Sequence, residues 1–231
     1  MMMPGMSMEP VASPEATTGL ALELGLFLAM WVAMMIAMMF PSVSPMVLLF
    51  ARVSKRPVGL SGQTQVPTGV FLAGYLVIWT RIGGAMYLAS RVMHWASGYI
   101  NGFDEWAFIG SAIILMAAGL YQFSGWKRVC LTHCCSPLSF ILHHWREGVL
   151  GTLRMGIEHG AYCVGCCWGL MLVMFVMGLM SLGWMEGLTI VIFLEKVGHY
   201  SPVLSKVVGG AFILLGVGIL LHPSLMQHLS A

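Results

Sequence analysis

The chain has 231 residues, of which 58% are hydrophobic and 9% are charged, and its mean hydropathy is +0.86. Soluble domains carry about 25% charged residues, so this composition excludes a water-exposed globule and a disordered polar chain. The net charge of +2 arises from 11 basic and 9 acidic residues without a basic tract, so nucleic-acid binding is not expected. The composition therefore predicts a protein embedded in membrane lipid.

A helix of about 20 apolar residues crosses a bilayer core, and the chain contains five strong windows of that length. A sixth segment, about 182–197, is shorter and contains Glu186. The strong windows are residues 20–40, 68–90, 106–125, 156–180 and 203–222. We therefore predict an all-α fold, a polytopic integral membrane helix bundle of about six transmembrane helices, forming a single domain over residues 20–222.

The distribution of basic residues predicts the topology. Lys and Arg accumulate in short cytoplasmic loops, and here they follow the first, third and fifth predicted helices. These basic groups lie on one side of the membrane only if the short segment 182–197, which is fifth in chain order, crosses the bilayer. Both termini are then predicted to be periplasmic in a bacterial inner membrane. The parts outside the membrane are then a Met-rich N-terminal tail, 1–19, a Cys-rich cytoplasmic loop, 126–155, and a short C-terminal tail, 223–231.

Prolines and glycines mark two features of these helices. Pro41 and Pro45 predict that the first helix ends or breaks there, because proline lacks a backbone donor. GxxxG spacings at 156–160 and 165–169 would let neighbouring backbones approach the fourth helix closely and would make it central. The alternative is that they reflect the general enrichment of glycine in membrane helices.

All six cysteines lie within residues 130–167. Residues three and four apart share one face of a helix, so His159, Cys163 and Cys166 or Cys167 form a continuous edge of imidazole and thiol groups. The preceding loop would add its cysteines by folding back against the inner end of the fourth helix. The predicted metal ligands are Cys130, Cys134, His159, Cys163, Cys166 and Cys167.

This donor set favours copper as Cu(I), with Zn(II) as an alternative, because both ions bind thiolate readily. Two further roles stay open for the cysteines: packing as small hydrophobic side chains, and forming a redox-active pair. Disulfide bonds are disfavoured because the predicted topology places both clusters in the cytoplasm, where thiols stay reduced.

The 21 methionines suggest a second set of soft ligands. Met30, Met34 and Met38 recur every four residues along the first predicted helix, where thioethers either pass Cu(I) inward or simply pack. The remaining candidates lie near the ends of the chain: Met3, Met6, Met8, His222 and His228.

Ionisable residues within the apolar segments are a third signal, because each is costly in lipid and is expected to face the bundle interior. They are Arg81, Glu158, Glu195 and Lys196. For Arg81 we expect a structural ion pair or contacts with backbone carbonyls. For Glu195 we expect an ion pair with Arg154 or Lys196, or an oxygen ligand for the metal. No catalytic residue follows from this pattern.

Taken together, these motifs resemble a bacterial family of predicted metal-binding integral membrane proteins whose domain has no known function. The resemblance spans about residues 20–221 and rests on the runs WVAMMIAMMFPSVSPM, GLYQFSGWKRVCLTHCCSPL, RMGIEHGAYCVGCCWGLML and FLEK. It implies a metal but no particular activity, while Cys135 and the MPGMSM tail look like additions of this chain. The characteristic positions of the family fall on Cys130, Cys134, His159, Cys163, Cys166, Cys167, Glu195 and Lys196.

The sequence favours a metal-binding membrane protein for Cu(I) acquisition, transfer or insertion over an enzyme. Its expected partners are membrane lipid, a periplasmic metal carrier or a cuproenzyme, and other subunits in a homo- or hetero-oligomer. Two alternatives stay open: a membrane metal-dependent oxidoreductase or a subunit of one, and a transmembrane thiol–disulfide relay through Cys163 and Cys166.

Overall fold

The computed structural model of the protein describes residues 14–54, 67–99, 103–177, 182–198 and 201–222. These residues form eight α-helices and no strand, which confirms the predicted all-α class. In chain order the helices are α1 (Pro14–Ser54), α2 (Thr68–Ser97), α3 (Phe103–Gln122), α4 (Gly125–Cys135), α5 (Pro137–His144), α6 (Gly148–Met177), α7 (Leu182–Val197) and α8 (Ser201–Leu221).

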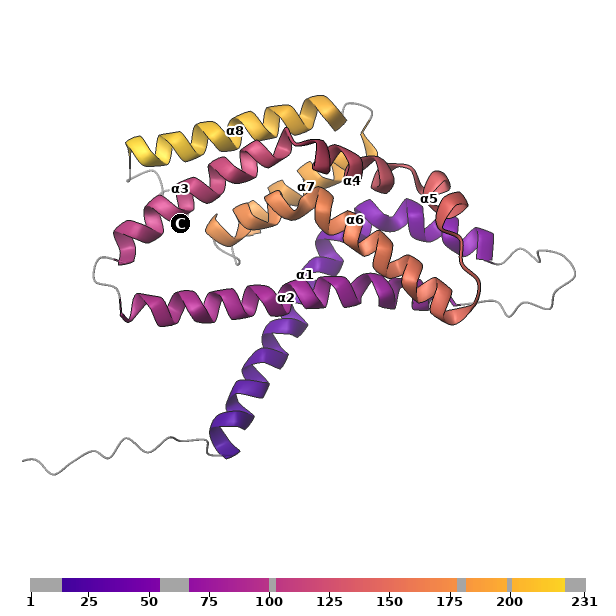
Figure 1. Ribbon diagram of the computed structural model, residues 1–231, viewed down its shortest axis with the longest axis horizontal. Helices are drawn as coiled ribbons and strands as arrows, with labels where there is room; N and C mark the ends of the chain where they lie inside the picture. The colour runs from indigo at the N-terminus through magenta and orange to yellow at the C-terminus, as the bar shows by residue number, and fades with distance from the viewer. Residues whose placement is uncertain (1–13, 55–66, 100–102, 178–181, 199–200, 223–231) are drawn as a thin grey trace, which may run out of the picture.

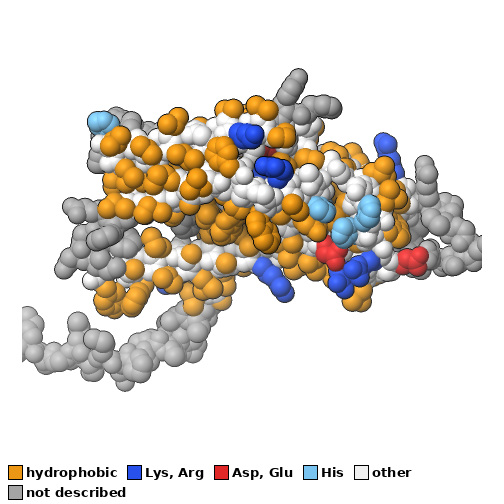
Figure 2. Space-filling model, turned by 45° about the horizontal axis from the view of Figure 1, so that its top comes forward, with side chains coloured by type: hydrophobic (Ala, Val, Ile, Leu, Met, Phe, Trp, Pro, Cys, Tyr) orange, Lys and Arg blue, Asp and Glu red, His pale blue; other side chains and the backbone are white. Residues whose placement is uncertain are grey.

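Four of the described helices, α1, α2, α6 and α8, are long and apolar enough to cross a membrane. The pair α3 and α4, bent by 62° at its break, would make a fifth span. α7 has 16 residues, and at about 1.5 Å per residue it is shorter than a bilayer core of about 30 Å. The number of six spans therefore stays a prediction that depends on α7. Figure 2 shows apolar side chains over much of the visible surface, as expected for helices in lipid.

The two prolines do not end the first helix. α1 continues through Pro41 and Pro45 to Ser54, so the expected helix end was wrong. Figure 1 shows instead that the indigo first part and the violet second part of α1 run in different directions. A proline inside a helix removes one backbone hydrogen bond and crowds the preceding turn, which accounts for a bend without a helix end.

The segment 126–155, predicted to be a loop, is largely helical. It contains almost all of α4, the whole of α5 and the first turns of α6, which begins at Gly148. Ser124 caps α4, because its hydroxyl oxygen accepts a hydrogen bond of 3.2 Å from the backbone N–H of Lys127. Pro137 begins α5, where its missing donor costs nothing. The cysteines of this segment therefore lie on a helix and not in a loop.

α6 is the central helix of the bundle. It packs against α2, α3, α4 and α7. In Figure 1, α3 and α8 run side by side along one edge and α2 runs along the other, with α6 between them. The candidate span in α6 is 56% buried, against 33% at most for the other candidate spans. Side chains on α6 are therefore the ones best shielded from lipid and water.

α2 and α6 approach each other closely at glycines. A Cβ atom at Gly74 would collide with the carbonyl oxygen of Leu153, and one at Gly156 would collide with the carbonyl oxygen of Phe71. Gly160 faces the same helix. Close approach, rather than the general glycine content of membrane helices, therefore explains the spacing at 156–160.

Adding one methyl group at this contact should loosen the bundle. We expect Gly74→Ala to lower the free energy of unfolding by about 1–3 kcal/mol, because the new Cβ has no room beside the α6 backbone. Gly84→Ala on the same helix is the matched control, since no atom lies within 4 Å of its Cβ position. Thermal unfolding in detergent measures both variants, and equal midpoints would contradict the close packing.

Candidate metal centre

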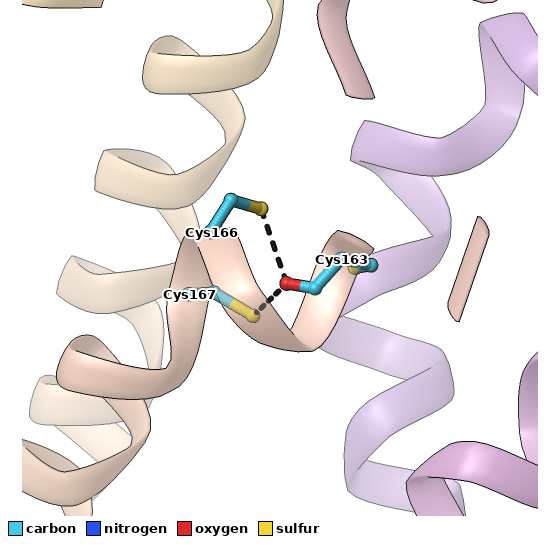
Figure 3. A group of neighbouring side chains, drawn as sticks. All are labelled: Cys163, Cys166 and Cys167. Carbon is cyan, nitrogen blue, oxygen red and sulfur yellow. Dashed lines mark hydrogen bonds between the residues drawn. The ribbon is translucent and has the colours of Figure 1, made fainter. Parts of the chain in front are cut away.

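Three of the predicted ligands meet near the middle of α6. The sulfur atoms of Cys163, Cys166 and Cys167 all lie within 4.8 Å of one another, and all three residues are buried. The thiols of Cys166 and Cys167 donate hydrogen bonds of 3.1 and 2.8 Å to the backbone carbonyl oxygen of Cys163, as Figure 3 shows. We call these three residues the thiol cluster. Their spacing on one helix brings the sulfur atoms within reach of a single ion.

α4 adds sulfur atoms beside the thiol cluster. The Sγ of Cys134 lies 3.8 Å from the Sγ of Cys166, although Cys134 does not belong to the mutually close group. The Sγ of Cys130 lies 2.6 Å from the position that a Cβ at Gly165 would occupy, so this glycine makes room for the thiol. The segment thus folds back onto the middle of α6 and not onto its inner end, because α6 begins earlier than predicted.

Cys135 points away from the cluster. Its thiol donates a 3.7 Å hydrogen bond to the backbone carbonyl oxygen of Glu195, and the residue is exposed. It is the neighbour of Cys134 in sequence but faces another helix, because successive residues on a helix point in different directions.

His159 is buried one turn before Cys163, but its nitrogens do not join the mutually close sulfur atoms. Its ring lies among Phe71, Tyr75 and Phe140, with centroid distances of 5.9, 6.2 and 5.2 Å. Its Nδ1 has no hydrogen-bond partner among the described residues. Aromatic packing therefore fixes this imidazole, and its role as a ligand stays a prediction.

Two buried polar side chains contact the sulfur of Cys163. The Nζ of Lys196 lies 2.9 Å from this Sγ, and the hydroxyl oxygen of Tyr75 lies 3.2 Å from it. An ammonium group in an apolar interior is stabilised by a negative partner, which Cys163 would supply if its thiol were deprotonated. Sequence analysis found Lys196 but missed Tyr75, whose signal is no more than a hydroxyl group within an apolar helix.

A second buried ammonium group joins α4 to α7. The Nζ of Lys127 lies 2.8 Å from both carboxylate oxygens of Glu195 and donates another hydrogen bond to the Oε1 of Gln122. The hydroxyl of Ser205 on α8 donates to the same amide oxygen at 3.2 Å. This network therefore ties four helices together, α3, α4, α7 and α8.

The pairing of Glu195 with Lys127 corrects the expectation that its partner is Arg154 or Lys196. Sequence analysis missed Lys127 because its segment was predicted to be a loop. Once the segment is helical, Lys127, Cys130 and Cys134 lie three and four residues apart and share one inward face. This spacing of three and four residues was the sequence signal that could have identified Lys127.

Two ionisable residues lie nearer the surface than expected. Arg81 is exposed, so its predicted place in the bundle interior was wrong. It lies two residues after the buried Trp79 and thus on the opposite side of α2. Glu158 is partly buried and pairs with Arg154 at 3.0 Å and with Arg146 at 3.6 Å.

The predicted methionine ladder does not share one environment. Met30 is 47% exposed and Met34 is half-buried, whereas Met38 is 2% exposed. A step of four residues exceeds one helical turn, so the stripe drifts around α1. Met35 and Met39 are the fully buried neighbours. His222 is exposed just after α8, and the other terminal candidates lie outside the described residues: Met3, Met6, Met8 and His228.

The chain matches the model of a known family. The model of the family described as PpoB2, copper chaperone, matches residues 28–219 of this chain. The chain belongs to this copper chaperone family. The match covers the thiol cluster together with Lys127, Glu195 and Lys196. No curated protein and no solved structure matches the chain. Membership of this family and the thiol cluster agree with the expected metal-binding character, and copper is the metal that the family handles.

Removing the negative partner of Lys127 should destabilise the helices around the thiol cluster. We expect Glu195→Gln to lower the free energy of unfolding by about 3–5 kcal/mol, because it leaves a buried ammonium group uncompensated. Glu186→Gln is the matched control, since this glutamate is exposed on the same helix. Thermal unfolding in detergent is the measurement, and a Glu195→Gln midpoint as high as that of the control would refute the role of the pair.

Proposed function

We propose that the protein binds Cu(I) at the thiol cluster and passes it to another protein. The observation that carries this proposal is the group of three buried sulfur atoms within 4.8 Å of one another. Thiolate is a soft ligand that suits Cu(I). Membership of a copper chaperone family supports copper as the cargo.

The charges around the thiol cluster also favour a monovalent ion. Two thiolates, the ammonium group of Lys196 and one Cu(I) ion sum to zero. The third thiol then stays protonated and keeps its hydrogen bond to the carbonyl oxygen of Cys163. Structural Zn(II) sites almost always have four tetrahedral ligands, whereas this cluster brings three sulfur atoms together. Copper is therefore the better fit.

The proposal includes a membrane topology and a direction of supply. We infer a bacterial inner-membrane protein with six spans and periplasmic termini, supported by the apolar helices and the grouping of basic residues. Copper would be acquired from, or inserted into, a periplasmic carrier or cuproenzyme. α7 is the span on which this topology depends.

A thiol–disulfide relay is the second candidate function, and one distance favours it. The Sγ atoms of Cys134 and Cys166 lie 3.8 Å apart, so this pair suits disulfide exchange with an external dithiol partner. A relay would cycle between dithiol and disulfide without metal. A Cu(I) site instead keeps its thiols reduced when the metal is removed.

Copper content tests the thiol cluster. We expect about one Cu(I) per purified chain and loss of most of it in Cys163→Ala with Cys166→Ala, because a single thiol of the cluster then remains. Cys135→Ala is the matched control and should retain the copper, since its thiol contacts the backbone of Glu195. Elemental analysis and thiol counts before and after chelation are the measurements.

Three outcomes would reject parts of this proposal. Full copper retention in the double variant would reject the cluster as the binding site. Zinc in place of copper would reject the cargo. Disulfide formation without bound metal in the wild-type protein would favour the relay.

Accessibility of the termini tests the topology. Tags at both ends should be reached from the periplasm, and a membrane-impermeant thiol reagent should not label Gly62→Cys beyond the parent chain, because the basic residues share the opposite side. Termini on opposite sides would show that α7 does not cross, and the periplasmic position of His222 would then be lost.

A further inference from the structure

A pocket of about 170 Å³ lies on the surface of α4 and α5, outside the thiol cluster. Three of its lining residues are histidines: His133 on α4, and His143 and His144 on α5. Figure 2 shows histidine side chains gathered on one face of the molecule. Copper binding at the thiol cluster uses none of these imidazoles.

The three histidines are oriented in the same way. The Nδ1 atoms of His133, His143 and His144 lie 2.9, 2.8 and 3.2 Å from the carbonyl oxygen four residues earlier on the same helix. A carbonyl oxygen accepts hydrogen bonds but cannot donate them, so each Nδ1 carries a proton. In the neutral ring each Nε2 then keeps its lone pair. Metal-binding histidines are typically held by such a bond from the other ring nitrogen.

Aromatic neighbours fix two of these rings. His133 stacks on Tyr162 with a centroid distance of 4.4 Å and an interplanar angle of 5°. His144 stacks on Phe140 at 4.6 Å and 9°. The centroids of His133 and His144 are 6.4 Å apart with an interplanar angle of 78°, so the two rings are neighbours on the wall of the pocket. Little ordering of side chains would be required on binding.

We propose that this pocket is a second copper site, formed by the Nε2 atoms of His133 and His144. The nitrogen atoms of all three histidines do not lie within 4.8 Å of one another, so His143 lines the pocket without completing a three-ligand group. The inference rests on the proposed function for copper as the ligand. Imidazole is a harder ligand than thiolate, so Cu(I) binds here more weakly than at the thiol cluster.

The position of the pocket connects it to the thiol cluster. Cys134 follows His133 directly on α4, and its Sγ lies 3.8 Å from that of Cys166. Copper held by His133 is therefore one residue along α4 from a thiol that contacts the cluster. The increase in ligand softness from imidazole to thiolate favours transfer from the pocket to the cluster.

Anaerobic titration of the full chain with Cu(I), against a competing chelator, tests the second site. We expect the first equivalent to show sulfur ligands in X-ray absorption and the second to show nitrogen ligands. In His133→Gln with His144→Gln the first equivalent should bind as in the wild type, while the dissociation constant of the second should rise at least tenfold. His94→Gln is the matched control, because His94 is an exposed histidine on α2.

The outcomes separate this inference from the proposed function. If the wild-type chain bound no first equivalent of Cu(I) through sulfur, the thiol cluster would be rejected as the copper site. A first equivalent bound by sulfur, with no nitrogen-bound second equivalent, would reject the histidine pocket alone. Unchanged second binding in the double variant would reject it too. If that variant unfolds, carbethoxylation of the wild-type chain tests the histidine pocket instead. Bound copper should protect His133 and His144 from the reagent, but not His94.

Discussion

Two ammonium groups buried in an apolar bundle determine how the helices of the candidate metal centre are arranged. An unpaired charge there costs several kcal/mol, so each lysine must lie against a negative partner. Lys127 of α4 pairs with Glu195, and Lys196 contacts the sulfur of Cys163. Glu195 and Lys196 are neighbours at the end of α7 and point to different helices. This end of α7 therefore holds α4 against α6, and the cysteines of both helices meet there.

At the proposed copper site, Lys196 would also affect how tightly the ion binds. A cation bound to Cys163 would lie close to the ammonium group of Lys196, whose Nζ is 2.9 Å from the sulfur. Repulsion between the two positive charges would be strong in an interior of low dielectric constant and would lower the affinity below that of an isolated thiolate cluster. A weaker site would suit the proposed transfer of copper to another protein. Tyr75, which is neutral, contacts the sulfur without adding to the repulsion.

The long helices and the thiol cluster were predictable because their signals are local. Hydropathy alone placed the start of α2 at Thr68, and helical spacing alone brought Cys163 and Cys166 to one face. α4 was missed because it is short and carries polar residues, which hides its apolar periodicity, whereas a short interfacial helix was expected around His143 and His144, where α5 lies. The contacts of Lys127 with Glu195 and of Tyr75 with Cys163 join residues that are distant in sequence, so they depend on tertiary packing.

The bend between α3 and α4 lets α4 place Cys134 beside the thiol cluster and His133 in the histidine pocket. Without the 62° change of direction, α4 would continue the axis of α3 and would not lie along α6 as it does. Successive residues on a helix point about 100° apart, so His133 can lie against Tyr162 while Cys134 faces Cys166. A straight helix would carry both His133 and Cys134 away from α6. The cap at Ser124 begins α4 at the point where the chain turns, and the proposed coupling of the histidine pocket to the thiol cluster depends on this turn.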